Sequence, residues 1–174
     1  MKIGNIKIFI VFFGCMLFRL LPLRAPNIEP IMASIMPLGR QYGTLFTFLF
    51  AVGSIVLYDL LTSFGSWTFT VALAYGLVAL LSSWYFKNRE GSIKNFAIFA
   101  FFATILFDLF TGVLIAPLLG KSIYTAFMLQ IPFTTLHLAG NIGFAITLSP
   151  ILDKWFASSK IFSISSISKP VLNS

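Results

Sequence analysis

The chain has 174 residues, of which 58% are hydrophobic, 17% aromatic and only 10% charged. A soluble globular domain carries about 25% charged residues, so the composition excludes such a domain and indicates a single domain whose solvent is lipid. The net charge of +7 does not indicate nucleic-acid binding, because the basic residues fall between apolar segments and form no basic helix. One cysteine, Cys15, and one histidine, His137, allow no internal disulfide and no recognisable metal site, so we expect no cofactor.

The apolar segments predict membrane-spanning helices, since a helix needs about 20 apolar residues to cross a bilayer. The first segment, after Lys2 and Lys7, mimics a secretory signal, but nothing downstream resembles a soluble exported domain, so we interpret it as a retained helix. A fifth segment is long enough but contains Pro132 and Pro150. The five segments are residues 5–23, 41–63, 67–86, 95–118 and 122–152.

A shorter apolar piece, Ile28–Leu38, would be only about 16 Å long as a helix. The positive-inside rule favours counting it as a crossing completed by extended backbone, because both termini and most basic residues then lie in the cytoplasm. The sequence therefore predicts an all-α six-helix transmembrane bundle over residues 1–157, with a short, proline-flanked second helix and a flexible cytoplasmic tail at 158–174. The cytoplasmic basic residues would be Lys2, Lys7, Arg40, Lys87, Arg89, Lys94, Lys154, Lys160 and Lys169, against Arg19, Arg24 and Lys121 outside.

The stretch FRLLPLRAPNIEPIMASIMPLG contains charges and prolines within an otherwise strongly hydrophobic chain. Non-helical backbone at membrane depth survives only where protein or a water-filled cavity satisfies its polar groups. We expect a folded lid over the outer end of the bundle, in which Arg19 or Arg24 pairs with Glu29. The alternative is a local salt bridge that only fastens a loop.

Asp59 and Asp108 lie in matching contexts, IVLYDLLT and TILFDLFT. Each would end a helix near the outer surface, before a loop that leads to Trp67 or Tyr124. This pattern predicts two similar helical hairpins, a weak internal repeat of the kind found in transporters. The aspartates either contact a ligand or cap the following turn. Trp67 belongs either to an interfacial aromatic belt or to a binding site.

The last helix carries a polar stripe, because Gln130, Thr134, His137 and Asn141 follow at spacings of four, three and four. In lipid such a stripe must face inward. It either provides hydrogen bonds between helices, each worth about 1 kcal/mol, or lines a cavity for a polar solute. The chain contains no phosphate-binding loop, nucleophile elbow or zinc-protease motif, and we expect no enzymatic activity.

Polar residues gather in the predicted outer half as a solute pocket would require. The candidate binding residues are Asn27, Glu29, Asp59, Trp67, Asp108, Tyr124, Gln130, Thr134, His137 and Asn141.

The chain resembles the substrate-binding S components of energy-coupling factor transporters. The likeness rests on RLLPLRAPNIEPIMASIMPLG, YDLLTSFGSWTFTVALAYGLV, FDLFTG and YTAFMLQIPFTTLHLAGNIGFA, and it covers Arg19 to Leu152. It implies a six-helix bundle that captures a vitamin or similar micronutrient and docks on a T subunit driven by two ATPase subunits. By location it also implies ligand contacts for Asp108, Tyr124, Gln130 and His137. The first helix departs from the family, since FIVFFGCMLF lacks the Ala-x-x-x-Ala docking patch.

We therefore expect a multi-pass protein of the cell inner membrane that binds a small solute and carries out no chemistry. One alternative is a non-catalytic scaffold similar to the rod-shape bundle proteins, with the polar stripe serving as packing contacts. An intramembrane enzyme is a third. An enclosed outer cavity lined by polar residues would favour a binder, whereas a space filled by phenylalanines would favour a scaffold.

Overall fold

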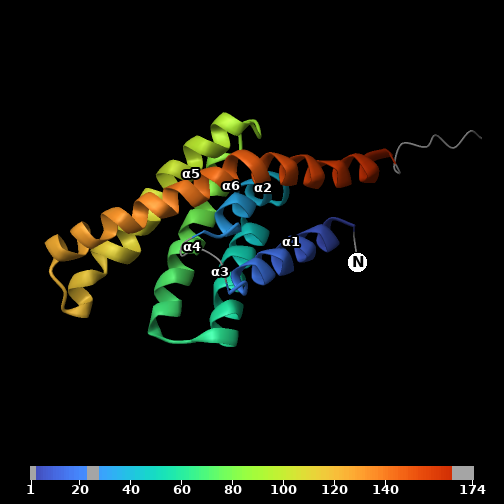
Figure 1. The fold of residues 1–174 in the computed structure, drawn as a ribbon. Coiled ribbons are helices and arrows are strands. Elements are labelled where there is room, and N and C mark those ends of the chain that lie inside the picture. Colours follow the sequence, from blue (N-terminus) through green and yellow to red (C-terminus); the bar gives the residue numbers. More distant parts are fainter. Residues whose placement is uncertain (1–2, 23–27, 166–174) are drawn as a thin grey trace, which may run out of the picture.

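A computed structural model describes residues 3–22 and 28–165 of the chain, with side chains for residues 6–22 and 28–158. These residues form six α-helices and contain no strand. Figure 1 shows their arrangement. The α-helices are α1 (Ile3–Arg19), α2 (Ile31–Tyr42), α3 (Thr44–Thr62), α4 (Ser66–Tyr85), α5 (Ile93–Asp108) and α6 (Ile123–Ser165), and between the last two lie a π-helix, η1 (Leu109–Leu114), and a 3-10 helix, η2 (Ala116–Leu119).

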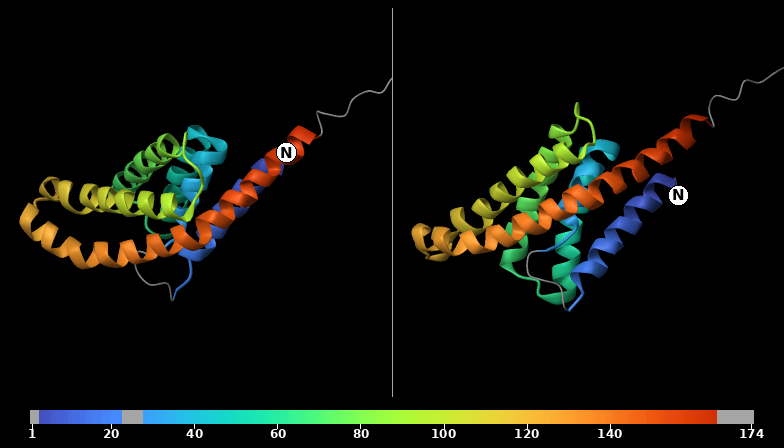
Figure 2. Two further views of the ribbon diagram at one scale, coloured as in Figure 1. Left: turned by 90° about the horizontal axis from the view of Figure 1, so that it is seen from above. Right: turned by 45° about the horizontal axis from the view of Figure 1, so that its top comes forward.

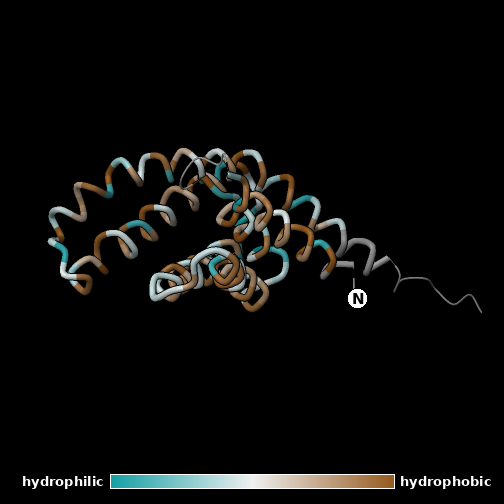
Figure 3. Tube along the Cα trace, turned by 60° about the horizontal axis from the view of Figure 1, so that its bottom comes forward, coloured by the Kyte–Doolittle hydropathy of each residue, from teal (hydrophilic) through white to brown (hydrophobic). Residues whose placement is uncertain are grey.

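Four helical stretches among the described residues are long and apolar enough to cross a membrane. Large hydrophobic side chains lie exposed along all of them, and Figure 3 shows hydrophobic residues along the whole helical trace. A surface of this kind is stable in lipid and not in water. The protein is therefore an all-helical membrane protein. The four stretches are Thr44–Thr62, Ser66–Tyr85, Ile93–Leu119 and Ile123–Ser158.

The two predicted hairpins are present, one formed by α3 and α4 and the other by α5, η1, η2 and α6. The first is closed by a short turn after which Thr68 Oγ1 accepts a hydrogen bond from Gly65 N at 3.2 Å, which fixes the start of α4. At the other end of α4 the chain turns into α5, where the Ser92 hydroxyl caps the helix by accepting from Asn95 N at 3.3 Å. Figure 2 shows that the tips of the two hairpins point in different directions.

The short helix α2 forms the centre of the bundle. It packs against α3, α4, α5 and α6, and every residue from Ile31 to Gly39 is buried. Close packing against α4 requires Gly39, because a Cβ atom there would lie 3.0 Å from Ser83 N. Pro30 precedes the helix and Pro37 lies inside it.

Gly43 joins α2 to α3 with a φ of 80°, a conformation that L residues rarely adopt. Gly39 and Gly43 have the four-residue spacing of a small-residue pair suited to close helix contact, but no atom lies within 4 Å of a Cβ built at Gly43. The two glycines therefore serve different purposes, one for packing and one for the turn.

The last helix is longer than its prolines suggest. α6 runs as one helix of 43 residues through Pro132 and Pro150 and continues to Ser165, into the segment predicted as a tail. Opposite it, α5 gives way to the π-helix η1 directly after Asp108. π-Helical turns widen the backbone locally and are common at functional sites. This one directly follows Asp108, the more buried of the two aspartates in the matching sequence stretches.

Candidate functional site

Asp108 and His137 form the core of the site. Asp108 is the last residue of α5, and it is 1% exposed. A hydrogen bond of 2.8 Å joins its Oδ1 atom to His137 Nδ1 on α6. The Asp108 side chain makes no cap hydrogen bond to η1. Its side chain therefore pairs with the polar stripe of α6 and does not cap the following turn.

Asn141 lies one turn farther along the same face of α6. Its Nδ2 atom donates to Thr104 Oγ1 on α5 at 2.9 Å, and the Thr104 hydroxyl donates to Ala100 O at 2.7 Å. All of these groups are buried. Asp108 Oδ2 and Asn141 Oδ1 are nevertheless without a hydrogen-bond partner among the described residues. The α5–α6 interface thus holds two buried acceptor atoms that its own side chains do not satisfy.

A second buried cluster forms around Glu29. Tyr75 of α4 donates a short hydrogen bond to Glu29 Oε1, and Arg19 Nε lies 3.1 Å from Glu29 Oε2. The Arg19 guanidinium also stacks on the Tyr58 ring, with Cζ 3.9 Å from the ring centroid. The predicted pairing of Arg19 with Glu29 is confirmed. Even so, Arg19 Nε and Nη1 make no aligned hydrogen bond in the described part of the chain.

Phe107 connects the two clusters. Its ring centroid lies 4.7 Å from that of Tyr75 and 5.6 Å from that of His137. Phe133 also packs edge-to-face against the imidazole, with ring centroids 5.8 Å apart. An aromatic ring therefore lies between the buried polar groups of the Glu29 cluster and the Asp108–His137 pair. Because these groups are buried, their charges and dipoles are only weakly screened.

Gln130 and Thr134 continue the stripe toward the tip of the α5–α6 hairpin, where they are half-buried. Gln130 Nε2 lies 3.4 Å from Thr134 Oγ1. The Gln130 amide rests against η1, because a Cβ atom on Gly112 would lie 1.8 Å from its Oε1 atom. Both residues line an open, mostly apolar groove of about 250 Å³ between α5 and α6.

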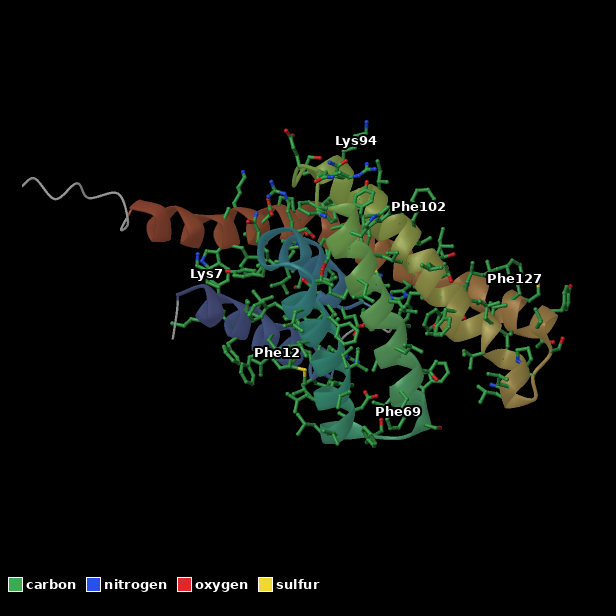
Figure 4. All side chains as sticks on the ribbon, turned by 180° about the vertical axis from the view of Figure 1, so that it is seen from behind. Lys7, Phe12, Phe69, Lys94, Phe102 and Phe127 are labelled. Carbon is green, nitrogen blue, oxygen red and sulfur yellow. The ribbon has the colours of Figure 1, made fainter. Side chains whose placement is uncertain are left out.

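Three predicted residues lie away from these clusters. Trp67 begins α4 at the tip of the first hairpin and is 49% exposed, while Tyr124 begins α6 at the tip of the second and is 74% exposed. Asp59 is half-buried on α3 and forms no ion pair with a described residue. Figure 4 shows Phe69 and Phe127, which lie near the two tips, far apart from each other. Asn27 falls outside the described residues.

The structure adds three residues that the sequence did not indicate: Tyr75, Thr104 and Phe107. Tyr75 and Phe107 lie inside apolar helical runs in which nothing distinguishes them from packing residues. The available signal for Thr104 was its position four residues before Asp108, which places both on one face of α5. No such signal was available for Tyr75, because its partner Glu29 lies 46 positions away.

Among the described residues, no group of three or more His, Cys, Asp or Glu side chains is placed to hold a metal ion. The cluster instead offers two buried acceptors on one side and a buried guanidinium on the other. Such an arrangement suits recognition of a polar molecule or hydrogen bonding between helices.

Comparisons with known proteins identify no relative. No protein-family model matches the chain, and neither the curated proteins nor the solved structures contain a match.

Proposed function

We propose that the protein is a membrane subunit that captures a small polar solute, such as a vitamin or similar micronutrient, for uptake. As in the S components that the sequence resembles, energy would come from separate partners, a T subunit and two ATPase subunits. The protein itself carries out no chemistry. It lies in the cell inner membrane with six crossings and both termini in the cytoplasm.

The observation that carries this proposal is the pair of unsatisfied acceptors, Asp108 Oδ2 and Asn141 Oδ1. A buried polar atom without a partner costs about 1–3 kcal/mol in proteins, and in lipid no bulk water relieves that cost. A solute with hydrogen-bond donors would offset it. Arg19 Nη1 also lacks a hydrogen-bond partner among the described residues, but the Phe107 ring lies between its cluster and the Asp108–His137 pair. The two acceptors therefore favour a small molecule that carries hydrogen-bond donors.

The proposed topology is supported by the distribution of basic residues over the structure. Arg40, Lys87, Arg89 and Lys94 lie at the end of the bundle where α4 turns into α5, whereas Lys121 lies at the tip of the α5–α6 hairpin. This asymmetry agrees with an orientation that places the α4–α5 turn in the cytoplasm. The Glu29 cluster lies directly before the start of α2, whereas the α4–α5 turn lies beside its end.

A second candidate function, a non-catalytic scaffold, is favoured by the aromatic contacts of His137. Phe107 and Phe133 both pack edge-to-face against its ring, as they would in a bundle whose polar stripe only joins helices. In a scaffold, the Asp108–His137 pair would fix how α5 and α6 pack and no solute would bind.

These candidates are distinguished by extracting small molecules from purified protein. We expect one solute to copurify with the wild type and to be lost from Asp108→Asn, which keeps the side-chain shape and removes its charge. Thr147→Val is the matched control on α6, since Thr147 is exposed and its hydroxyl donates to Gly143 O of its own helix, its one partner among the described residues. A solute retained by Asp108→Asn as well as by the control, or absent from every sample, would refute capture at this site.

A further inference from the structure

A polar groove of about 380 Å³ lies at the end of the bundle opposite the hairpin tips. It is formed by the end of α2, the end of α4 and the turn that leads to α5. Figure 4 shows this end of the molecule near Lys94. The groove is lined by Arg40, Gln41, Phe86, Lys87, Asn88, Arg89 and Glu90.

One cation of the groove is held in place by α6. Arg40 Nη1 donates to both carboxylate oxygens of Asp153, at 2.9 and 2.8 Å, and Arg40 Nε donates to Arg89 O at 3.3 Å. Gln41 Nε2 donates to Asp153 Oδ1 at 2.8 Å. This network fixes the groove wall and the turn backbone together. Because Asp153 neutralises Arg40, the attraction for an anion must come mainly from the other cations.

Those cations are Lys87 and Arg89, which are exposed and form no ion pair within the described residues. The Arg89 guanidinium stacks on the ring of Tyr85, with Cζ 4.2 Å from the centroid, which orients it. The exposed Glu90 carboxylate opposes them, but it is a single anion against two cations.

The aromatic residues place the groove at the depth of lipid headgroups. A second groove of about 340 Å³, lined by Trp84, Tyr85, Asn88 and Arg89, adjoins the first. Trp84 is 75% exposed on the last turn of α4, and exposed Trp and Tyr at helix ends mark the membrane interface. Lipid tails can therefore contact the protein surface around Trp84. The cationic groove lies beside this surface, at the level of the headgroups.

We propose that this groove binds the phosphate of an anionic phospholipid, with Lys87 and Arg89 contacting the headgroup and Trp84 packing against its chains. A guanidinium held flat by an aromatic ring presents a planar fork that matches a phosphate. Basic pockets on the cytoplasmic side of membrane proteins are suited to anionic headgroups. The proposed topology puts the α4–α5 turn on that side. The site is independent of the solute cluster, which lies beyond α2.

Native mass spectrometry of the purified protein titrated with phosphatidylglycerol or phosphatidylcholine tests the proposal. Each basic residue near an anionic membrane surface contributes about 1 kcal/mol, or about fivefold in affinity. We expect phosphatidylglycerol to bind more tightly than phosphatidylcholine, Lys87→Gln and Arg89→Gln each to lower that affinity about fivefold, and Glu90→Gln to raise it. Arg89→Lys should bind less well than the wild type because it keeps the charge and loses the planar fork.

Lys121→Gln is the control, because Lys121 is an exposed cation before α6 at the other end of the bundle. Its affinity for phosphatidylglycerol should equal that of the wild type. Equal loss in Lys121→Gln and Lys87→Gln would show general attraction to charge and overturn the site. Competition by inorganic phosphate at the same concentration as lipid would identify a free-anion site and overturn the lipid assignment. If Arg89→Gln does not fold, the opposite shifts of Lys87→Gln and Glu90→Gln decide the question.

Discussion

The hydrogen bond between Asn141 and Thr104 gives the sharpest test of the α5–α6 interface. Thr104→Val keeps the shape of the side chain and removes the acceptor of Asn141 Nδ2, which lies 2.9 Å away. Asn141 Oδ1 is already unpaired, so the substitution leaves a fully buried amide without any partner. A buried polar group that loses its partner costs about 1–3 kcal/mol. We expect the free energy of unfolding to fall by about that amount.

Thr147→Val provides a matched control for this prediction. Both threonine hydroxyls donate to a carbonyl oxygen of their own helix at 2.7 Å, but Thr147 is exposed and accepts no bond from another helix. Substitution there should change stability by less than about 0.5 kcal/mol. The comparison separates the interhelical bond from the general effect of replacing threonine by valine in a helix.

The assay is reversible unfolding in mixed micelles, followed by circular dichroism as the denaturing detergent is increased. Asn141→Leu and the double variant complete a double-mutant cycle, for which we expect a coupling of about 0.5–1.5 kcal/mol. The double variant should be more stable than the sum of the single losses predicts, because no buried amide remains. Equal effects of Thr104→Val and Thr147→Val, or a coupling near zero, would refute the role of this bond.

Three further substitutions and one topology measurement follow from the structure. Gly43→Ala should destabilise the protein by about 1–3 kcal/mol, because the φ of 80° at this position suits only glycine. Gly14→Ala should stabilise the protein by about 0.5–1 kcal/mol, because Gly14 lies inside α1 with no atom within 4 Å of the new Cβ. Unfolding midpoints that shift in the same direction in both variants would contradict this pair of predictions. Gly91→Ala should cost about 1–3 kcal/mol, because the new Cβ would lie 2.2 Å from Asp153 Oδ2, and a midpoint equal to that of the wild type would show that the carboxylate moves freely. Reporter fusions within residues 87–94 should be cytoplasmic, and an external location would remove the six-crossing topology.

The sequence predicted what depends on local pattern. Apolar runs located the helices, and the spacing of His137 and Asn141 correctly placed them on an inward face of α6. The cost of leaving a charge alone in lipid predicted that Arg19 or Arg24 pairs with Glu29, and the structure shows the pair with Arg19. These inferences rest on the period of a helix or on the large cost of an unpaired charge in lipid. Neither requires knowledge of the tertiary fold.

The sequence could not show which helices meet. α2 lies at the centre of the bundle because α3, α4, α5 and α6 surround it, although its length suggested only a marginal crossing. Pro132 and Pro150 do not interrupt α6, because a long helix in lipid can accommodate the loss of a backbone donor. Trp67 and Tyr124 lie near the tips of two different hairpins, and the pattern of residues along one helix does not show whether two such tips lie together.

Native mass spectrometry of the protein, gently extracted from its own membranes, tests solute capture most directly. We expect a bound species that is smaller than a phospholipid, is present in the wild type and in Thr147→Val, and is absent from Asp108→Asn. T and ATPase subunits in the same spectrum would support the proposed partners. A wild-type protein that carries no small solute, while it retains other membrane or cell-shape proteins, would contradict capture and establish the scaffold.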